Sequence, residues 1–344
     1  QPEVKSTAWH RLGEIRERQA QYDDAFACHT TANGLLLDTP AAHRAAGTPV
    51  FHQLPHLFLP GTEAMVERWA ARRFDDRLPD PVFLVGFPRS GTTLAESILA
   101  AIPGAVTSDE EPVLNGTMRS ALAMCAAQGA PPTPQTLMGA LDGLSDAQVG
   151  ELRREYWRSV GEMVSPVARR ATVFVDKTPL RILHLAYVSL LFPRARIVCM
   201  VRDPRDCCLS CYTQDFAINT VLVRFLTQES TGDAYAAVTD FWLRVRGRIP
   251  NPVHEVRYED LVRDFEPTAQ RMVEFLGAEW SEEVGRFQEL AAARTIRTPS
   301  YQAVTGRVSD RAIGRWKHYE RHIGPMLERV GPFVEPLGYA GEGG

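Results

Sequence analysis

The chain has 344 residues, 44% of them hydrophobic and 23% charged, which is typical of a globular protein with a large core. A formal net charge of −4 argues against nucleic acid as the main partner, because proteins that bind it usually present a basic surface. No apolar run reaches the roughly 20 residues of a membrane span and no signal peptide is visible, so we expect a cytoplasmic protein without a membrane span. Six cysteines without a paired framework predict free, mostly buried thiols in a reducing compartment.

Residues 1–36 predict a helical hairpin that resembles one tetratricopeptide repeat, although any amphipathic hairpin would show a similar pattern. Trp9, Leu12 and Gly13 begin the pattern, and Tyr22 and Phe26 continue it. Because a single repeat cannot bury its own apolar face, the hairpin either ends a longer array or packs on the main domain. A contact with another protein or a second copy of the chain through these helices is a further expectation. Residues 37–78 predict a helical linker, with a helix at 62–74.

From residue 79 to 340, apolar segments rich in β-branched residues alternate with amphipathic segments. The expected strands are 82–85, 105–107, 172–175, 197–201 and 253–256, and the expected helices are 92–101, 112–128, 146–164, 180–192 and 234–248. Apolar strands separated by helices predict an α/β fold, a P-loop-like three-layer sandwich with a central parallel sheet. In such sheets ligands bind at the carboxyl ends of the strands.

The loop after the first of these strands has the glycine spacing of a Walker A phosphate-binding loop, with Gly86 and Gly91 before a predicted helix. Backbone N–H groups and the positive end of a helix dipole bind phosphate-like anions in such loops. However, Thr92 stands where a nucleotide triphosphatase has lysine, and Arg89 is the only cation in the loop. The loop therefore predicts an anion site and argues against a metal-bound triphosphate.

Three other strand ends carry polar residues: Lys177, Arg202 and Tyr258. Because the carboxyl ends of parallel strands meet at one edge of a sheet, Arg89, Lys177 and Arg202 predict a focused anion pocket. Arg202 also occupies the place where a Walker B strand would end in a metal-binding Asp. Asp203 is predicted to cap the helix that follows.

These motifs resemble those of sulfotransferases that use 3′-phosphoadenosine 5′-phosphosulfate (PAPS). Residues 88–93 resemble the 5′-phosphosulfate loop of that family, residues 202–210 its 3′-phosphate motif, and residues 314–317 the late Gly/Arg/Trp element that closes over the nucleotide. The resemblance extends from about residue 73 to about residue 324. It is strongest to bacterial sulfotransferases with attached tetratricopeptide repeats, which are related to tyrosylprotein sulfotransferases.

The resemblance implies transfer of a sulfuryl group from PAPS to a hydroxyl, with 3′,5′-adenosine bisphosphate as product. Glu110 would be the general base, although a one-residue loop insertion would give that role to Glu111. Lys177 and Arg89 would stabilise the leaving oxygen, so that no metal is required. The implied donor-binding residues are Pro88, Arg89, Ser90, Gly91, Thr92, Thr93, Arg202, Ser210, Tyr258, Thr298, Ser300, Arg315, Trp316 and Lys317.

Two other classes of function compete with this one. A P-loop nucleotide kinase or NTPase would need ATP and Mg²⁺, and Thr92 in place of lysine argues against it. A non-catalytic scaffold built on the repeat would not need Glu110, Lys177 and Arg202 together. The acceptor stays open among a small molecule, a glycan and a peptide. Glu111 and Pro112 stand where tyrosylprotein enzymes have Thr-Arg, which argues against protein tyrosine.

Overall fold

The computed structural model describes residues 1–292 and 310–340, and the predicted donor contacts Thr298 and Ser300 lie outside this range. Contacts divide the chain into two units. Unit 1 comprises Gln1–His52, Arg202–Asp240 and Asp310–Gly344, and unit 2 comprises Gln53–Val201 and Phe241–Ser309. Each unit has its own cluster of buried apolar side chains.

Unit 2 contains the predicted parallel sheet, whose strand order is β2-β3-β1-β4-β5. The strands are β1 (Val82–Gly86), β2 (Val106–Thr107), β3 (Phe174–Lys177), β4 (Ile197–Val201) and β5 (Val253–Arg257). The prediction for the third long strand was wrong by two residues, because β3 starts later and continues through Asp176 and Lys177. These polar residues pair with Phe83 and Leu84 of β1, so the ladder extends beyond the apolar run.

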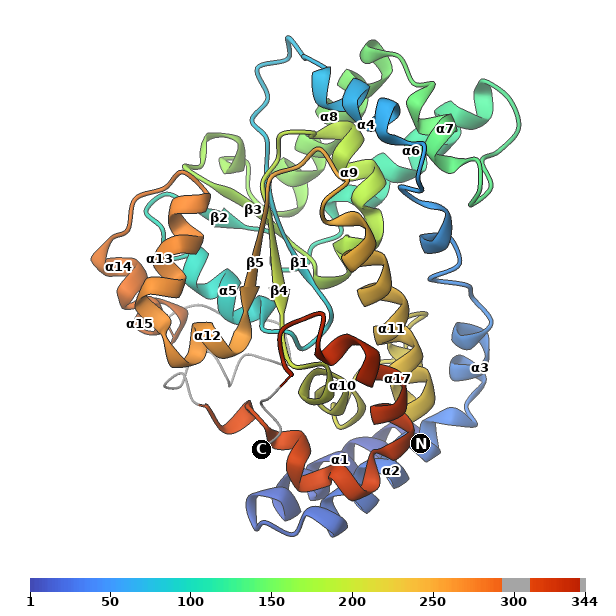
Figure 1. The fold of residues 1–344 in the computed structure, drawn as a ribbon, viewed down its shortest axis with the longest axis vertical. Coiled ribbons are helices and arrows are strands. Elements are labelled where there is room, and N and C mark those ends of the chain that lie inside the picture. Colours follow the sequence, from blue (N-terminus) through green and yellow to red (C-terminus); the bar gives the residue numbers. More distant parts are fainter. Residues whose placement is uncertain (293–309, 341–344) are drawn as a thin grey trace. The chain divides into compact units, whose positions relative to one another are not determined.

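Helices cover both faces of this sheet, which confirms the predicted three-layer architecture (Figure 1). On one face, Leu84 and its neighbours pack against α5 and the helices after β5. On the other face, the ring of Phe83 lies 6.4 Å from that of Tyr156 and 6.1 Å from that of Phe192. The helices of unit 2 are α4 (Glu63–Ala71), α5 (Thr92–Leu99), α6 (Val113–Ala127), α7 (Leu137–Asp142), α8 (Asp146–Met163), α9 (Leu185–Leu191), α12 (Tyr258–Arg263), α13 (Phe265–Phe275), α14 (Glu282–Gly285) and α15 (Phe287–Ala292), with 3₁₀ helices η1 (Leu54–His56), η2 (Ala168–Arg170) and η3 (Pro179–His184).

The segment 180–192, predicted as one helix, is divided into η3 and α9. In η3 the buried Arg181 reaches back to Asp176, with 3.0 Å between Nη2 and Oδ1, and to the hydroxyl of Thr178. Asp176 also accepts a hydrogen bond from Tyr156 Oη at 3.1 Å. This buried network fixes the chain where it leaves β3.

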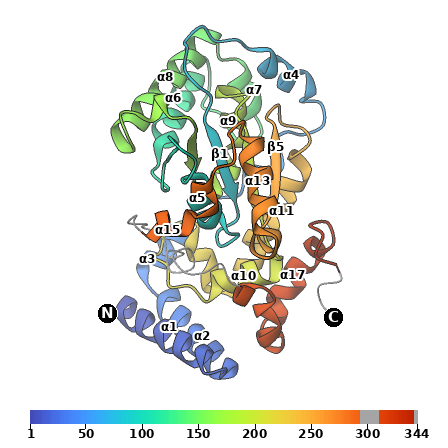
Figure 2. The same cartoon turned by 90° about the vertical axis from the view of Figure 1, so that its left-hand side faces the viewer.

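Unit 1 is helical, and its helices α1 and α2 form the predicted N-terminal hairpin (Figure 2). Its helices are α1 (Pro2–Arg18), α2 (Tyr22–Leu37), α3 (Pro40–Ala46), α10 (Pro204–Tyr212) and α17 (Gly324–Val334), with 3₁₀ helices η4 (Leu222–Leu226), η5 (Asp310–Ala312) and η6 (Arg315–His322). Helix α11 (Gln228–Val245) begins in unit 1, and its residues after Asp240 belong to unit 2. The helix predicted at 234–248 begins six residues earlier, at Gln228. The six cysteines are free and buried, as predicted. No helix within 1–292 or 310–340 has the length and apolar character of a membrane span.

The close packing of α1 on α2 depends on Gly13. A Cβ atom at Gly13 would lie 2.7 Å from the ring of His29, whereas a Cβ atom at the exposed Gly34 of α2 would meet nothing within 4 Å. We therefore expect Gly13→Ala to destabilise the full chain by about 1–2 kcal/mol, because overpacking outweighs the gain in helix propensity.

Gly34→Ala is the matched control and should stabilise the chain by about 1 kcal/mol through helix propensity alone. Urea unfolding followed by circular dichroism measures both free energies. Equal effects of the two substitutions would show that the hairpin packs in another way.

Candidate active site

The loop between β1 and α5 needs both of its glycines. A Cβ atom at Gly86 would lie 2.7 Å from the carbonyl oxygen of Met200 and 2.6 Å from Ser90 Oγ. Gly91 has φ +101°, and a Cβ atom there would lie 2.6 Å from Tyr258 Cδ2. The structure thus places Tyr258 directly against the loop, and the loop backbone packs too tightly for any side chain at either glycine.

The same loop has the properties of an anion site. Gly91 is the N-cap of α5, and this glycine makes no side-chain cap hydrogen bond. The first turn of any helix carries N–H groups without an intrahelical partner and the positive end of the helix dipole, and here that turn begins with Thr92 and Thr93. The buried Ser90 Oγ has no hydrogen-bond partner among the residues described. Arg89 is half-buried and has a left-handed backbone, with φ +69°.

A cluster of one cation and three acids lies at the carboxyl end of β3. The Nζ atom of Lys177 lies 2.7 Å from Glu110 Oε1, 2.9 Å from Glu96 Oε2 and 4.0 Å from Asp109 Oδ1. The Lys177 side chain is fully buried. Burial lowers its pKa, but the carboxylates of Glu96 and Glu110 outweigh burial and raise the pKa above its ordinary value. Lys177 is therefore charged at neutral pH.

Backbone hydrogen bonds hold the acidic loop against β3. Lys177 N donates to Ser108 Oγ at 2.9 Å, and Glu110 N donates to the carbonyl oxygen of Lys177 at 3.1 Å. Asp109 and Glu110 both have left-handed backbones, with φ +46° and +68°. Such conformations cost about 1–3 kcal/mol each and concentrate at functional sites. The strain and the hydrogen bonds together fix the direction of the Glu110 side chain.

Of the two candidate bases, Glu110 is the one whose carboxylate contacts the Lys177 Nζ atom, at 2.7 Å. Its side chain is 40% exposed, so a substrate can reach it. The backbone N–H of Glu111 donates to the carbonyl oxygen of Ser108 at 3.0 Å, which closes the turn of the acidic loop.

Glu96 is a member of the cluster that the motifs did not indicate. It is buried on α5, and its Oε1 atom accepts the backbone N–H of Asp109 at 3.1 Å. Burial raises the pKa of Glu96, and the nearby charge of Lys177 offsets only part of that shift. The available signal was a lone acid in a helix whose other residues are all apolar or small, directly after the anion loop.

The predicted 3′-phosphate residues, Arg202 and Ser210, are buried and belong to unit 1. Arg202 follows β4 directly in the chain, and its Nη2 atom donates to the carbonyl oxygen of Ala312 at 2.6 Å. Asp203 caps α10 as predicted, accepting the N–H of Arg205 at 2.9 Å. Ser210 lies two turns into α10.

The buried carboxylate of Asp206 on α10 forms hydrogen bonds with the late element 314–317. Asp206 accepts the N–H groups of Gly314 at 2.6 Å and Trp316 at 2.8 Å, and the guanidinium of Arg205 lies 4.1 Å from the Trp316 ring centre. Burial is the main cause of the raised pKa of Asp206. Within unit 1, therefore, the two predicted nucleotide-binding segments are adjacent.

The guanidinium of Arg315 contacts α1, the first helix of the N-terminal hairpin. Its guanidinium donates to Glu17 of α1 through Nε at 2.5 Å and Nη2 at 2.7 Å, and through Nη1 to Thr213 Oγ1 at 3.1 Å. Burial raises the pKa of Glu17, but the bonded guanidinium outweighs burial and the pKa is lowered. An ion pair thus joins α1 to the element for which nucleotide closure was predicted.

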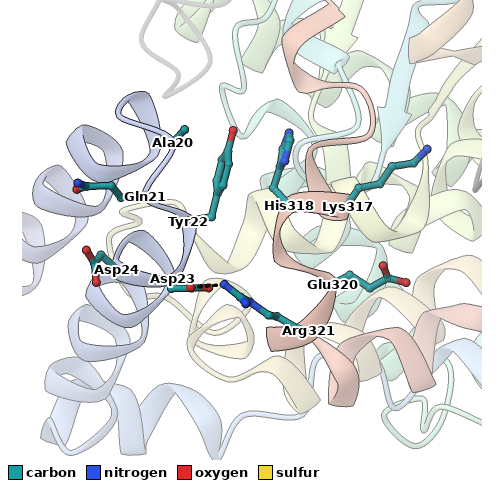
Figure 3. Close-up of a pocket in the computed structure, with 9 residues that line it drawn as sticks. All are labelled: Ala20, Gln21, Tyr22, Asp23, Asp24, Lys317, His318, Glu320 and Arg321. Carbon is teal, nitrogen blue, oxygen red and sulfur yellow. Dashed lines mark hydrogen bonds and ion pairs between the residues drawn. The ribbon is translucent and has the colours of Figure 1, made fainter.

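A polar pocket of about 500 Å³ lies between the α1–α2 turn and η6 (Figure 3). Tyr22 and His318 stack there with ring centres 4.3 Å apart. Asp23 pairs with Arg321 and, at 2.6 Å, with His322 Nε2. The exposed Lys317 is the one residue of this pocket among the predicted donor contacts. The lining is Ala20, Gln21, Tyr22, Asp23, Asp24, Lys317, His318, Glu320 and Arg321.

Comparisons with known proteins agree on one family. The family model described as "Sulfotransferase family" matches residues 81–282. An uncharacterized protein of Aquifex aeolicus is 23% identical over 331 residues, which are 95% of this chain and 41% of that protein, so the chain spans less than half of this relative. Protein-tyrosine sulfotransferase 2 of Gallus gallus is 25% identical over 284 residues, covering 78% of this chain and 73% of that protein.

Solved structures with a similar fold are sulfotransferases at low identity. The sulfotransferase domain from the Synechococcus PCC 7002 olefin synthase has a TM-score of 0.45 at 19% identity, covering 76% of this chain and 98% of that one. Sulfotransferase STF9 from Mycobacterium avium has a TM-score of 0.43 at 15% identity, covering 91% and 96%.

The ion pair between Glu17 and Arg315 predicts a pH-dependent stability. Because the pKa of Glu17 is lowered in the folded chain, the pair stabilises fully above the unfolded value of 4.5 and is lost as pH falls through the folded value. We expect Glu17→Gln to destabilise the chain by about 2 kcal/mol at pH 7 and by less at pH 3.5, which lies below the unfolded value.

Urea unfolding at the two pH values measures the difference. Glu14→Gln is the control, since Glu14 forms an exposed pair with Arg11 on the same helix and should change stability by less than about 0.5 kcal/mol. A Glu17→Gln effect that is equal at both pH values, or no larger than that of the control, would contradict the stabilising role of the pair.

Proposed function

Because the chain belongs to the sulfotransferase family, we propose that it transfers the sulfuryl group of PAPS to a hydroxyl acceptor, with Glu110 as general base. The observation that carries the proposal is the 2.7 Å pair between Glu110 and the buried Lys177, in the same unit as the anion-binding loop. This reaction requires two groups of the protein: a base that accepts the proton of the acceptor hydroxyl, and a cation that stabilises the leaving oxygen.

The residues of the loop fit a phosphosulfate group. PAPS would supply an electrophilic sulfur and an anionic leaving group. The amides of Gly91, Thr92 and Thr93 and the hydroxyl of Ser90 are suitable donors to its oxygens, and Arg89 adds a positive charge. The N–H groups at the start of α5 and the buried Ser90 Oγ support this assignment.

The remaining donor contacts are proposed on the family resemblance. Arg202 and Ser210 would bind the 3′-phosphate, which distinguishes PAPS from ATP. The ring of Tyr258 would pack near the nucleotide, in keeping with its contact to Gly91. The other proposed contacts are Pro88, Thr298, Ser300, Arg315, Trp316 and Lys317. For Arg315, the pair with Glu17 would have to open or be shared with the ligand.

Glu110 and Lys177 would act in turn. The partly exposed carboxylate of Glu110 accepts the proton of the acceptor hydroxyl, which makes the oxygen a nucleophile. Lys177, held charged by its neighbours, is fully buried in this structure and would have to turn toward the ligand. It would then donate N–H bonds to the negative charge that develops on the leaving oxygen. Arg89 shares this role from the loop. The cationic side chains do the work for which kinases use Mg²⁺, so the proposed reaction needs no metal.

Calorimetry and transfer assays on the full chain test the proposal. We expect 3′,5′-adenosine bisphosphate to bind in the presence of EDTA and ATP with Mg²⁺ to bind weakly, because the site is proposed to read a 3′-phosphate. Labelled PAPS with pooled small-molecule, glycan and peptide acceptors then identifies the acceptor class. Binding of ATP only, and only with Mg²⁺, would contradict the proposed donor.

Substitution of the base separates chemistry from binding. Glu110→Gln should lower the transfer rate by about 10²–10⁴-fold, since an amide cannot accept the proton, while the affinity for the bisphosphate stays close to that of the wild type. Glu111→Gln is the comparison, because it removes the adjacent acid. If Glu111→Gln abolishes transfer and Glu110→Gln does not, the base has been assigned to the wrong residue.

A further inference from the structure

Lys177 lies between two carboxylates that differ in access. The side chain of Glu96 is 7% exposed and that of Glu110 is 40% exposed. An acceptor hydroxyl can reach Glu110 but not Glu96, so Glu96 is not a base for the proposed reaction. Its Oε2 atom nevertheless lies 2.9 Å from the Lys177 Nζ atom. Because burial of a carboxylate costs free energy, the presence of Glu96 beside Lys177 calls for a functional explanation.

The proposed reaction changes the charge of Glu110, and this change explains why Lys177 has a second carboxylate beside it. When Glu110 accepts a proton it becomes neutral, and the fully buried Lys177 loses one of its two close counter-charges. A buried ammonium group without a paired carboxylate is strongly disfavoured. Glu96 keeps its 2.9 Å contact with Lys177 through this step, since the substrate does not reach it.

Glu96 also connects the three parts of the cluster. It lies on α5 after the anion loop, its Oε2 atom bonds Lys177 at the end of β3, and its Oε1 atom holds the N–H of Asp109 in the strained acidic loop. The charged groups that the structure places on Lys177 are Glu96 from α5 and Asp109 and Glu110 from the loop after β2.

We propose that Glu96 is a positioning residue, which keeps Lys177 protonated and in place while Glu110 takes up the proton of the acceptor. The role in catalysis rests on the proposed function, but the effect of Glu96 on Lys177 does not. It can be measured without turnover, because the chain has only three lysines, Lys5, Lys177 and Lys317.

The experiment is a pH titration of the full chain labelled with ¹³C-lysine and followed by NMR. Lys5 and Lys317 are exposed and serve as references within each spectrum. In the wild type, the Lys177 signal should titrate at or above the two references. In Glu96→Gln it should titrate below them, because one carboxylate is lost while the side chain stays buried. Lys177 titrating last in both proteins would overturn the proposal.

Kinetics test the catalytic part. We expect Glu96→Gln to lower kcat by about 10²-fold with little change in the KM for the donor. We also expect the basic limb of the pH profile of kcat to move to lower pH. Asp76→Asn is a matched control, since Asp76 and Asp80 flank another buried cation, Arg153, in a similar way. It should lower stability and leave the basic limb where it is. A basic limb that does not move in Glu96→Gln would overturn the proposed role.

Glu96→Asp covers the case in which the amide variant does not fold. The shorter Asp side chain keeps the negative charge but is too short to keep the 2.9 Å contact with Lys177 Nζ. We therefore expect kcat to fall while Lys177 still titrates with or above Lys5 and Lys317. A wild-type kcat in Glu96→Asp would contradict the positioning role. Failure of the proposed function has a separate signature: the wild type would neither bind the bisphosphate nor transfer sulfate, whatever the titration of Lys177 shows.

Discussion

The positive charge of Lys177, buried at the end of a strand, is the constraint on which the rest of the site depends. A buried ammonium group must be paired, and the chain pairs it with Glu96 from α5 and Glu110 from the acidic loop. To bring these groups together, β3 must extend beyond its apolar run, and the acidic loop must take up two left-handed residues. The placement of the cation therefore accounts for the departures from regular structure around it.

The parallel sheet explains why these groups meet. Every strand of unit 2 is parallel to its neighbours, so the residues that follow the strands gather at one edge. Gly86 and Gly91 let the first loop pack against Met200 and Tyr258, and Gly91, as the N-cap of α5, makes no side-chain cap hydrogen bond. The proposed anion site and the proposed base for proton transfer then lie in consecutive loops of one unit.

Much of this could be predicted from the sequence, and what could not has physical reasons. Most of the strands are rich in apolar, β-branched residues, so their existence and their parallel arrangement followed from the pattern, and the glycine spacing indicated the proposed anion loop. The end of β3 was missed because Asp176 and Lys177 are polar, and only their pairing with β1 keeps them in the strand. Glu96 was missed because its burial depends on β3 and the acidic loop. The partner of Arg315 is 298 positions away, a distance over which local patterns carry no information.

Single-turnover transfer by Lys177→Met tests the central claim most directly. The substitution removes the charge and keeps an apolar side chain of similar length. With labelled PAPS bound to excess enzyme, the account predicts that the chemical step slows by about 10²–10³-fold while the bisphosphate still binds. Transfer at the rate of the wild type would contradict the account, because the charge around which the site is built would then have no part in the reaction.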